Sequence, residues 1–294
     1  MTKLALHAIS RGSHGILINN HVQDGQQIRT QVEALAPYVE FIGYEDLAAR
    51  IAAPRRRKPF CLLTFDDGKA INAEETGPEL FKLGVPTVFY MVTGLTGTMT
   101  PLWFDCLAAV QRANPDGDIP HVSHFKTMSW RDRKAAVEAL CSAHGVTADV
   151  SQSAQRVMSW EQAERMERDG FELGAHTVNH AILTTETPEE AKRQLGDSVR
   201  HMRERGLRCR SFAFPNGNTN QELVQFAIGL GLESTVSTVP LWLSRNQPLD
   251  CLPRLYMKDT AGEFYVQTKT FLARSGFLLK NPNGEGRRYR SSLV

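Results

Sequence analysis

The chain has 294 residues, 41% of them hydrophobic and 22% charged, a composition typical of a globular protein that buries a full core. Its 34 basic residues nearly balance 32 acidic ones, and the net charge of +2 offers no general electrostatic basis for binding nucleic acid or a membrane surface. The five cysteines include no C-x-x-C pair, which argues against a disulfide framework and against a cysteine zinc site. The first residues contain only a short apolar run, so we expect no signal peptide, no membrane span and a cytoplasmic location.

Residues 1–58 are predicted to form an N-terminal α/β segment. The strings GILINNHV and YVEFIG are typical of short strands, and the apolar residues Ile28, Val32 and Leu35 follow helical spacing between them. The stretch APRRRKP then combines prolines with basic residues, which favours a solvated connection over a nucleic-acid-binding patch.

Residues 59–258 show the alternation of strands and helices that is typical of a barrel core. FCLLTF and PTVFYMV are continuous apolar runs, which predict parallel strands joined by the helix PELFKLGV. Residues of about 94–157 interrupt this alternation. We predict that they form an insertion whose helices, WFDCLAAVQR and RDRKAAVEALCSA, could wall a site.

After the insertion the alternation resumes. The pattern predicts, in order, the helix SWEQAERMERDG, the strand FELGAH, a helix over about 188–205, the strand SFAFP and the segments LVQFAIGLG, STVSTV and LPRLYM. Residues 259–294 are expected to form a C-terminal helix and a loose tail. A single α/β domain of the barrel type, spanning residues 1–294, accounts for the whole pattern.

Two adjacent carboxylates, Asp66 and Asp67, follow the apolar strand FCLLTF, and Gly68 then turns the chain. The carboxyl ends of strands are where α/β folds place their sites. Neighbouring carboxylates repel each other unless a cation is bound or one of them is protonated, so this pair indicates a metal ion. A solvent-exposed Asp-Asp-Gly turn is the alternative.

His176 and His180 lie at the end of the next predicted strand but one, FELGAH, and are four positions apart. If the chain coils as it leaves the strand, both rings lie on one face and can reach one ion. A capping or surface arrangement is the alternative for the histidines alone. Two strand-end motifs that bring carboxylates and imidazoles to the same mouth favour a single metal site.

TFDDG, the H-T-x-x-H of residues 176–180 and FAFPNG occur in the order of the first three motifs of a known family. Over roughly residues 16–258 the chain resembles the polysaccharide deacetylases, the NodB-homology enzymes of carbohydrate esterase family 4, and in particular an exopolysaccharide-type subgroup. The resemblance implies a distorted (β/α)7-type barrel. It also implies a hydrolase that removes the N-acetyl group from an N-acetylated sugar.

By position, the resemblance implies that Asp67, His176 and His180 bind one divalent ion. Zinc is expected, with Co²⁺, Ni²⁺ or Mn²⁺ as alternatives. Such an ion lowers the pKa of bound water and polarises an amide carbonyl, and Asp66 would take the proton as the general base.

The third motif implies further contacts with the substrate. The backbone N–H of Asn216, in place of the usual aromatic residue, would donate to the oxyanion of the reaction, and a backbone donor does not depend on its side chain. Pro215 and Gly217 would line the substrate beside it. Trp103 in the insertion and Trp242 after STVSTVP could pack against a sugar ring, although a buried core position is an open alternative for each.

The chain departs from the family pattern at the partner of the general base. Many relatives carry an arginine where this sequence has Ala213. Arg254, in LDCLPRLYM, could supply the guanidinium from a later strand and hold Asp66 ionised and oriented. A solvent-facing arginine is the alternative.

A second departure concerns the general acid, because relatives often use a late histidine and this chain has none after His201. The proton donor to the leaving amine is therefore unassigned. His21, His121 and His124 could reach the mouth, or could be structural or exposed.

These observations predict a deacetylase that acts on an N-acetylated sugar in a surface polysaccharide or its precursor, and a cytoplasmic location favours the precursor. Hydrolysis of another amide, such as a formyl-sugar or a cyclic imide, is one alternative. A glycan-binding protein with reduced catalysis is another. No nucleic-acid partner is expected, and the oligomeric state is left open.

Overall fold

The computed structural model describes residues 14–21, 24–54, 56, 58–260 and 263–266. Its centre is a sheet in the order β7-β6-β5-β4-β3-β1-β8-β9, with β2 paired to β3. The strands from β7 to β8 run parallel and β9 is antiparallel to β8. The strands are β1 (Gly15–Asn20), β2 (Glu40–Phe41), β3 (Phe60–Phe65), β4 (Thr87–Met91), β5 (Glu172–Ala175), β6 (Ser211–Ala213), β7 (Ser234–Val236), β8 (Leu255–Thr260) and β9 (Glu263–Val266).

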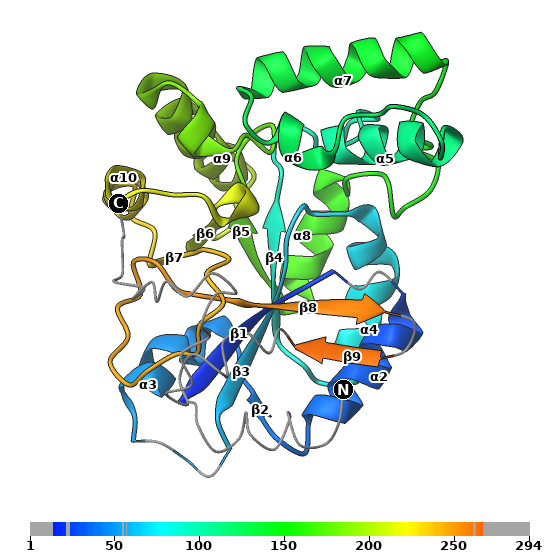
Figure 1. Cartoon of the computed structure of the whole chain (residues 1–294). Helices are drawn as coiled ribbons and strands as arrows, with labels where there is room; N and C mark the ends of the chain where they lie inside the picture. The colour runs from blue at the N-terminus through cyan, green and yellow to red at the C-terminus, as the bar shows by residue number, and fades with distance from the viewer. Residues whose placement is uncertain (1–13, 22–23, 55, 57, 261–262, 267–294) are drawn as a thin grey trace, which may run out of the picture.

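Helices surround this sheet, which curls into a half-barrel (Figure 1). The α-helices are α2 (Gly25–Leu35), α3 (Leu47–Ala52), α4 (Gly77–Lys82), α5 (Trp103–Ala113), α6 (Val122–Phe125), α7 (Trp130–His144), α8 (Trp160–Arg168), α9 (Pro188–Glu204) and α10 (Gln221–Gly229). Short 3-10 turns, η1 (Tyr44–Asp46), η3 (Leu183–Thr185) and η4 (Pro215–Gly217), and one π-helical turn, η2 (Asn72–Thr76), complete the described elements.

The central strands are buried on both faces, as parallel strands covered by helices should be. Along β1, Ile16 and Ile18 pack in the cluster that contains the helices α2, α4, α8 and α9, whereas Leu17 packs in a second cluster on the concave side. Along β3, Leu62 faces the concave side and Leu63 faces the helices. Because successive side chains of a strand point to opposite faces, every second position of β1 and β3 leads into the barrel interior.

The chain that precedes β8 closes the curl. Val236 in β7 pairs with Leu252, and the Leu252 N–H donates to the Thr235 carbonyl at 2.8 Å. Leu252 lies in the concave cluster, so Arg254, two positions on, also faces the interior. A residue near the end of the described chain thereby reaches the same interior as β1 and β3.

This architecture confirms the expected α/β class, and the predicted strands and helices of residues 59–258 are found in the predicted order. The strand β1 of the N-terminal segment lies between β3 and β8 and pairs with both, so it belongs to the same sheet as the strands of the core. The described part of 259–294 contains the end of β8 and β9, and the expected C-terminal helix and tail stay a prediction because residues 267–294 lie outside the described chain. No helix in the described ranges is long and apolar enough to cross a membrane.

The predicted insertion forms α5, α6 and α7, which stand together beyond one end of the sheet (Figure 1). The helices α5 and α7 share an apolar cluster of their own around Leu107, Phe125 and Val137. The insertion returns to the barrel where Met158 N–H donates to the Gly68 carbonyl at 2.8 Å. It is therefore tied to the turn that follows β3.

Candidate metal and catalytic site

The two aspartates follow β3 at the mouth of the barrel, and the backbone turns there. The interior positions of β3 are Leu62 and Thr64, so the next residue of the same parity, Asp66, also faces the interior. Asp67 has a φ of 75° and Gly68 a φ of 62°, both in the left-handed region. A Cβ on Gly68 would lie 2.9 Å from the Met91 sulfur, so this turn requires glycine. The turn directs the two carboxylates to different neighbours.

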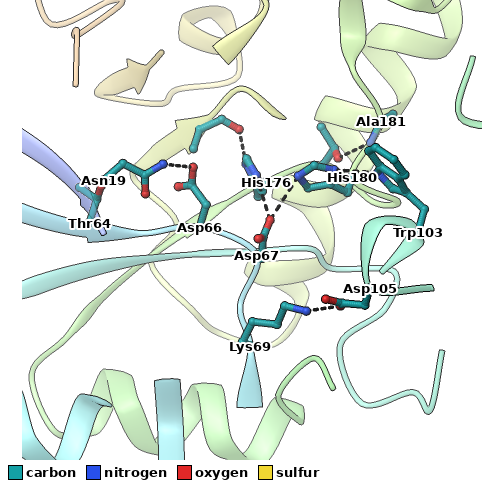
Figure 2. A network of polar contacts seen from close by, with 12 residues as sticks. Asn19, Thr64, Asp66, Asp67, Lys69, Trp103, Asp105, His176, His180 and Ala181 are labelled. Carbon is teal, nitrogen blue, oxygen red and sulfur yellow. Dashed lines mark hydrogen bonds and ion pairs between the residues drawn. The ribbon is translucent and has the colours of Figure 1, made fainter. Parts of the chain in front are cut away.

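Asp67 faces two imidazoles that follow β5 (Figure 2). Its Oδ1 lies 3.6 Å from His176 Nε2 and 3.2 Å from His180 Nε2. One ligand atom from each of the three residues lies within 4.8 Å of the others. His176 is 1% and His180 8% exposed, so the strand-end motifs do converge on one buried cluster.

Backbone strain accompanies this cluster. Asp67, Thr177 and His180 all have positive φ, with values of 75°, 66° and 53°, a conformation that costs a residue other than glycine about 1–2 kcal/mol. Hydrogen bonds hold the loop in place, because Thr93 and Gly94 N–H donate to the carbonyls of Thr177 and Val178. Strain that the surroundings maintain in this way is typical of functional sites.

The ring of His176 is oriented for a ligand. Its Nδ1 lies 2.7 Å from the Ala213 carbonyl, which can only accept a hydrogen bond, so Nδ1 carries the proton and Nε2 presents a lone pair toward Asp67. Two nitrogens and one carboxylate oxygen are the ligand set of many catalytic zinc sites, which keep further positions open. The residues present therefore fit a divalent transition-metal ion.

The surroundings of Asp67 keep it ionised. Burial alone would raise its pKa, but the hydrogen bond from His180 and the charges of His180, His176 and Lys69 hold the pKa of this carboxyl well below its usual range. Lys69 itself is buried and pairs with Asp105 of the insertion helix α5 (Figure 2). Neither Lys69 nor Asp105 was singled out from the sequence, because their pairing depends on how α5 folds back.

Asp66 is held by a different set of groups. Arg254 Nη1 donates to Asp66 Oδ1 at 2.7 Å and Nη2 to Oδ2 at 2.8 Å, a two-point contact that fixes the carboxylate plane. Asn19 Nδ2, from β1, adds a third donor to Oδ2 at 2.8 Å (Figure 2). Burial favours the neutral acid, but the charges of Arg254 and His176 and the hydrogen bonds from Arg254 together outweigh it, and the pKa of Asp66 lies below its usual value.

Arg254 is itself fixed within the barrel. The residue is 1% exposed, Nη1 also donates to Thr64 Oγ1 at 3.0 Å, and Nε donates to the Ser237 carbonyl at 2.9 Å. Its guanidinium lies 5.5 Å from the centre of the Tyr90 ring. The structure thus places Arg254 inside the barrel against Asp66 and not at the surface.

Asn19 was not identified from the sequence, although a signal for it exists. It pairs in register with Thr64, and it has the interior parity of Leu17 on β1. Knowing that β1 and β3 are parallel neighbours would have placed Asn19 beside Asp66. That adjacency follows from the sheet order, which the hydrophobic pattern alone does not provide.

The third motif forms the turn η4 beside the mouth. Asn216 has a φ of 58°, and asparagine tolerates this conformation better than most residues. Gly217 has a φ of 74°, and a Cβ on it would lie 2.0 Å from Thr238 Oγ1. Pro215 is buried, and Lys126, which caps the end of α6, donates to Asn216 Oδ1 at 2.6 Å. The insertion therefore reaches this turn as well.

The two tryptophans occupy different environments. Trp103 is half-buried at the start of α5, and its indole N–H donates to His180 Nδ1 at 3.3 Å (Figure 2). Trp242 is 7% exposed and lies in the main core cluster, the alternative that the sequence left open. A substrate contact for either residue stays a prediction.

Of the three histidines considered as proton donors, His21 lies nearest to this chemistry. Its ring packs 4.6 Å from the Tyr256 ring, and burial lowers the pKa of this imidazole although the charges of Asp67 and Asp66 oppose the change. His121 and His124 belong to the surface of α6 and its N-cap, where His121 bonds with Ser123.

Comparisons with known proteins agree with this geometry. The family model described as polysaccharide deacetylase matches residues 53–235, more than half of the chain. A relative from Bacillus subtilis (strain 168), described as "Putative polysaccharide deacetylase YxkH", is 20% identical over 250 residues, which cover 82% of this chain and 70% of the relative.

Solved structures share the fold at low sequence identity. The deacetylase domain of BpsB from Bordetella bronchiseptica superposes with a TM-score of 0.56 at 17% identity, over 82% of this chain and 95% of that domain. IcaB from Ammonifex degensii gives 0.54 at 17% identity, over 85% and 94% of the two chains. The Streptococcus pyogenes deacetylase PplD, solved in complex with acetate, gives 0.53 at 17% identity, over 82% and 90%. The curled sheet is therefore the distorted barrel that the motifs implied, and the chain belongs to the polysaccharide deacetylases of the NodB-homology type.

Proposed function

We propose that the protein is a divalent-metal-dependent hydrolase that removes the acetyl group from an N-acetylated sugar of a polysaccharide or its precursor. The observation that carries this proposal is that the two adjacent carboxylates contact different sets of residues. Asp67 faces the two imidazoles of the candidate metal site, whereas Asp66 faces Arg254 and Asn19. A site that only bound a cation would have no use for a second, separately oriented carboxylate.

Asp67, His176 and His180 would hold the ion. When bound, it would supply Lewis-acid polarisation of the amide carbonyl and a lowered pKa for a coordinated water. Metal ligation needs an imidazole nitrogen with a free lone pair and an ionised carboxylate. The buried ring of His176 and the carboxylate of Asp67 are both in these states. Zinc is the ion we propose first, because the two-nitrogen, one-oxygen set suits it.

Asp66 would act as the general base. Its two-point contact with Arg254 keeps it ionised and fixes both oxygens, so a proton taken from the attacking water would be received at a defined position. The contact from Asn19 restricts the carboxylate further. Of this carboxylate's environment, the sequence suggested Arg254 and missed Asn19.

The leaving amine must gain a proton before the carbon–nitrogen bond breaks. We propose His21 as the donor, because its ring lies beside Tyr256 and within the electrostatic range of both aspartates. The backbone N–H of Asn216 would donate to the oxyanion from the turn η4. Neither role needs a histidine late in the chain.

The substrate would be a glycan or a glycan precursor that carries N-acetyl groups. Membership of the polysaccharide deacetylases and the likeness to solved deacetylases support the deacetylase chemistry. Hydrolysis of a formyl-sugar or of a cyclic imide is the alternative on the same barrel. The cytoplasmic location stays a prediction.

The experiment compares the wild type with Asp66→Asn in acetate release from a panel of N-acetylated sugars and oligosaccharides. We expect metal-dependent release by the wild type and a loss of about 10²-fold or more in the variant, because a general base contributes about 10²–10⁴-fold. Asp169→Asn, a change of the same type at an exposed position, is the control and should release acetate at the wild-type rate. Sugar binding with a full complement of metal but no release of any acyl product would refute the hydrolase and favour a glycan-binding protein.

A further inference from the structure

Two arginines are among the largest fully buried side chains of the described residues, and only one is explained by the catalytic carboxylate. Arg254 pairs with Asp66. Arg133, on the insertion helix α7, is 1% exposed, and its hydrogen bonds go to backbone carbonyls instead. A second buried guanidinium therefore has a function in the fold that the catalytic carboxylate does not account for.

Burying the charged side chain of Arg133 costs free energy. Burying a cation costs several kcal/mol unless its donors are satisfied, and burial lowers the pKa of this guanidinium despite the charge of Glu186. Nε donates to the Phe125 carbonyl at 3.1 Å and Nη2 to the Met128 carbonyl at 2.8 Å. These two bonds fold the insertion around Arg133, but they leave Nη1 for a partner outside the insertion.

That partner is a metal ligand. Arg133 Nη1 donates to the carbonyl of His180 at 3.3 Å. His180 has a left-handed backbone, with a φ of 53°, and therefore needs external support to keep its ring aimed at Asp67. The guanidinium also stacks 5.1 Å from the centre of the Trp103 ring, and Trp103 touches the same histidine. The insertion thus contacts both the backbone and the ring of His180.

We propose that Arg133 is a positioning residue for the metal centre, which makes the insertion a structural part of that centre and not only a wall beside it. The inference rests on the proposed role of His180 as a ligand. Arg133 touches neither the substrate nor the ion, and it acts by holding the His180 carbonyl. Its planar fork matters as well as its charge, because three of its donors meet three carbonyls at once, those of Phe125 and Met128 within the insertion and that of His180 beyond it.

The test measures the dissociation constant of Co²⁺, followed by its visible absorption, for the wild type and for Arg133→Lys. Lysine keeps the positive charge but lacks the fork. We expect the dissociation constant to rise about tenfold or more, the range found when groups that support a metal ligand are changed. Arg131→Lys, on the exposed side of the same helix, should bind cobalt as the wild type does.

Two further variants separate positioning from simple loosening of the insertion. Val137→Ala thins the buried face of α7 without touching His180, so it should lower the melting temperature but leave cobalt binding unchanged. Trp103→Phe removes the other insertion contact to His180. An indole N–H can only donate, so it favours the tautomer with the proton on Nε2, the atom that faces Asp67. This variant should therefore bind cobalt at least as tightly as the wild type.

Metal binding by the wild type gives an independent measurement if Arg133→Lys does not fold. Coupling between two sites is reciprocal, so cobalt that is held through His180 should slow amide hydrogen exchange in α7. Unchanged exchange there would overturn the proposal, as would equal weakening of cobalt binding in Val137→Ala and Arg133→Lys at equal loss of melting temperature. A wild type that binds no cobalt would instead refute the metal-dependent function itself.

Discussion

Replacing Arg254 tests most directly the hypothesis that Asp66 is a general base. The sequence indicated Arg254 as a partner of Asp66, and the structure places the two side chains in contact. Arg254→Met keeps most of the side-chain volume inside the barrel but removes the donors to Asp66 Oδ1 and Oδ2. Asp66 keeps only the hydrogen bond from Asn19. The carboxyl would then sit in a buried position without its cation.

The magnitude follows from burial. The side chain of Arg254 is 0% and that of Asp66 8% exposed, so the pair lies in the range where removing one partner costs about 3–5 kcal/mol. Loss of the cation also raises the pKa of Asp66, because burial, which favours the neutral acid, is then opposed less strongly. We expect lower stability and a fall in turnover of at least about 10²-fold, the contribution of an ionised and oriented base.

The assay measures acetate release, metal content and unfolding free energy together. Metal content should stay at the wild-type level, because Asp67, His176 and His180 are not contacts of Arg254. Arg254→Lys should recover part of the turnover, since it restores charge but not the two-point contact. Wild-type turnover in Arg254→Met would remove Arg254 from the catalytic machinery and refute the reasoning about Asp66.

Two other substitutions test contacts that support the segments around the site. Glu190 accepts the Trp130 indole N–H at 2.6 Å and pairs with Arg193, which with its other contacts lowers its pKa from 4.5 to about 2. A lowered carboxyl pKa stabilises the fold above about pH 4.5, and this stabilisation disappears as the pH falls to about 2. Glu190→Gln should therefore cost about 1 kcal/mol at pH 7, because solvent screens this partly exposed pair, and almost nothing at pH 2 in acid-unfolding curves, and a loss that does not vary with pH would contradict this. Gly217→Ala would place a Cβ 2.0 Å from Thr238 Oγ1 at a φ of 74°, so thermal unfolding should show a loss of about 1–3 kcal/mol and turnover should fall; wild-type values for both would contradict the strain argument.

Hydrophobic pattern and strand-end position were enough to predict much of this molecule. The runs FCLLTF, PTVFYMV, FELGAH and SFAFP each supplied a strand of the sheet, because strands buried on both faces carry a strong and continuous signal. The cluster of Asp67, His176 and His180 was predictable for a related reason. Parallel strands bring their carboxyl ends to one edge, so motifs that end β3 and β5 must meet.

The parts that escaped prediction depend on contacts between distant segments. Asn19 could not be placed beside Asp66 until β1 was known to be the neighbour of β3. Asp105 and Arg133 come from an insertion whose periodicity predicts helices but not their orientation over the barrel. The β8–β9 pair was not predicted, because the parallel pairing of β8 with β1 is a contact between distant segments and β9 depends on β8.

The position of Arg254 shows how the family pattern can change while the carboxylate of Asp66 keeps a guanidinium partner. Ala213 ends β6 and is fully buried in the concave cluster, which it shares with Leu252, two positions before Arg254. Both positions open into the same interior, so an arginine at each would place two guanidinium groups there, and like charges in a buried space disfavour each other. A small residue at 213 leaves the interior to one cation, and its carbonyl is still used, because it accepts the hydrogen bond from His176 Nδ1. What the proposed base requires is a guanidinium at a given position in space, and a curled sheet offers that position from more than one strand.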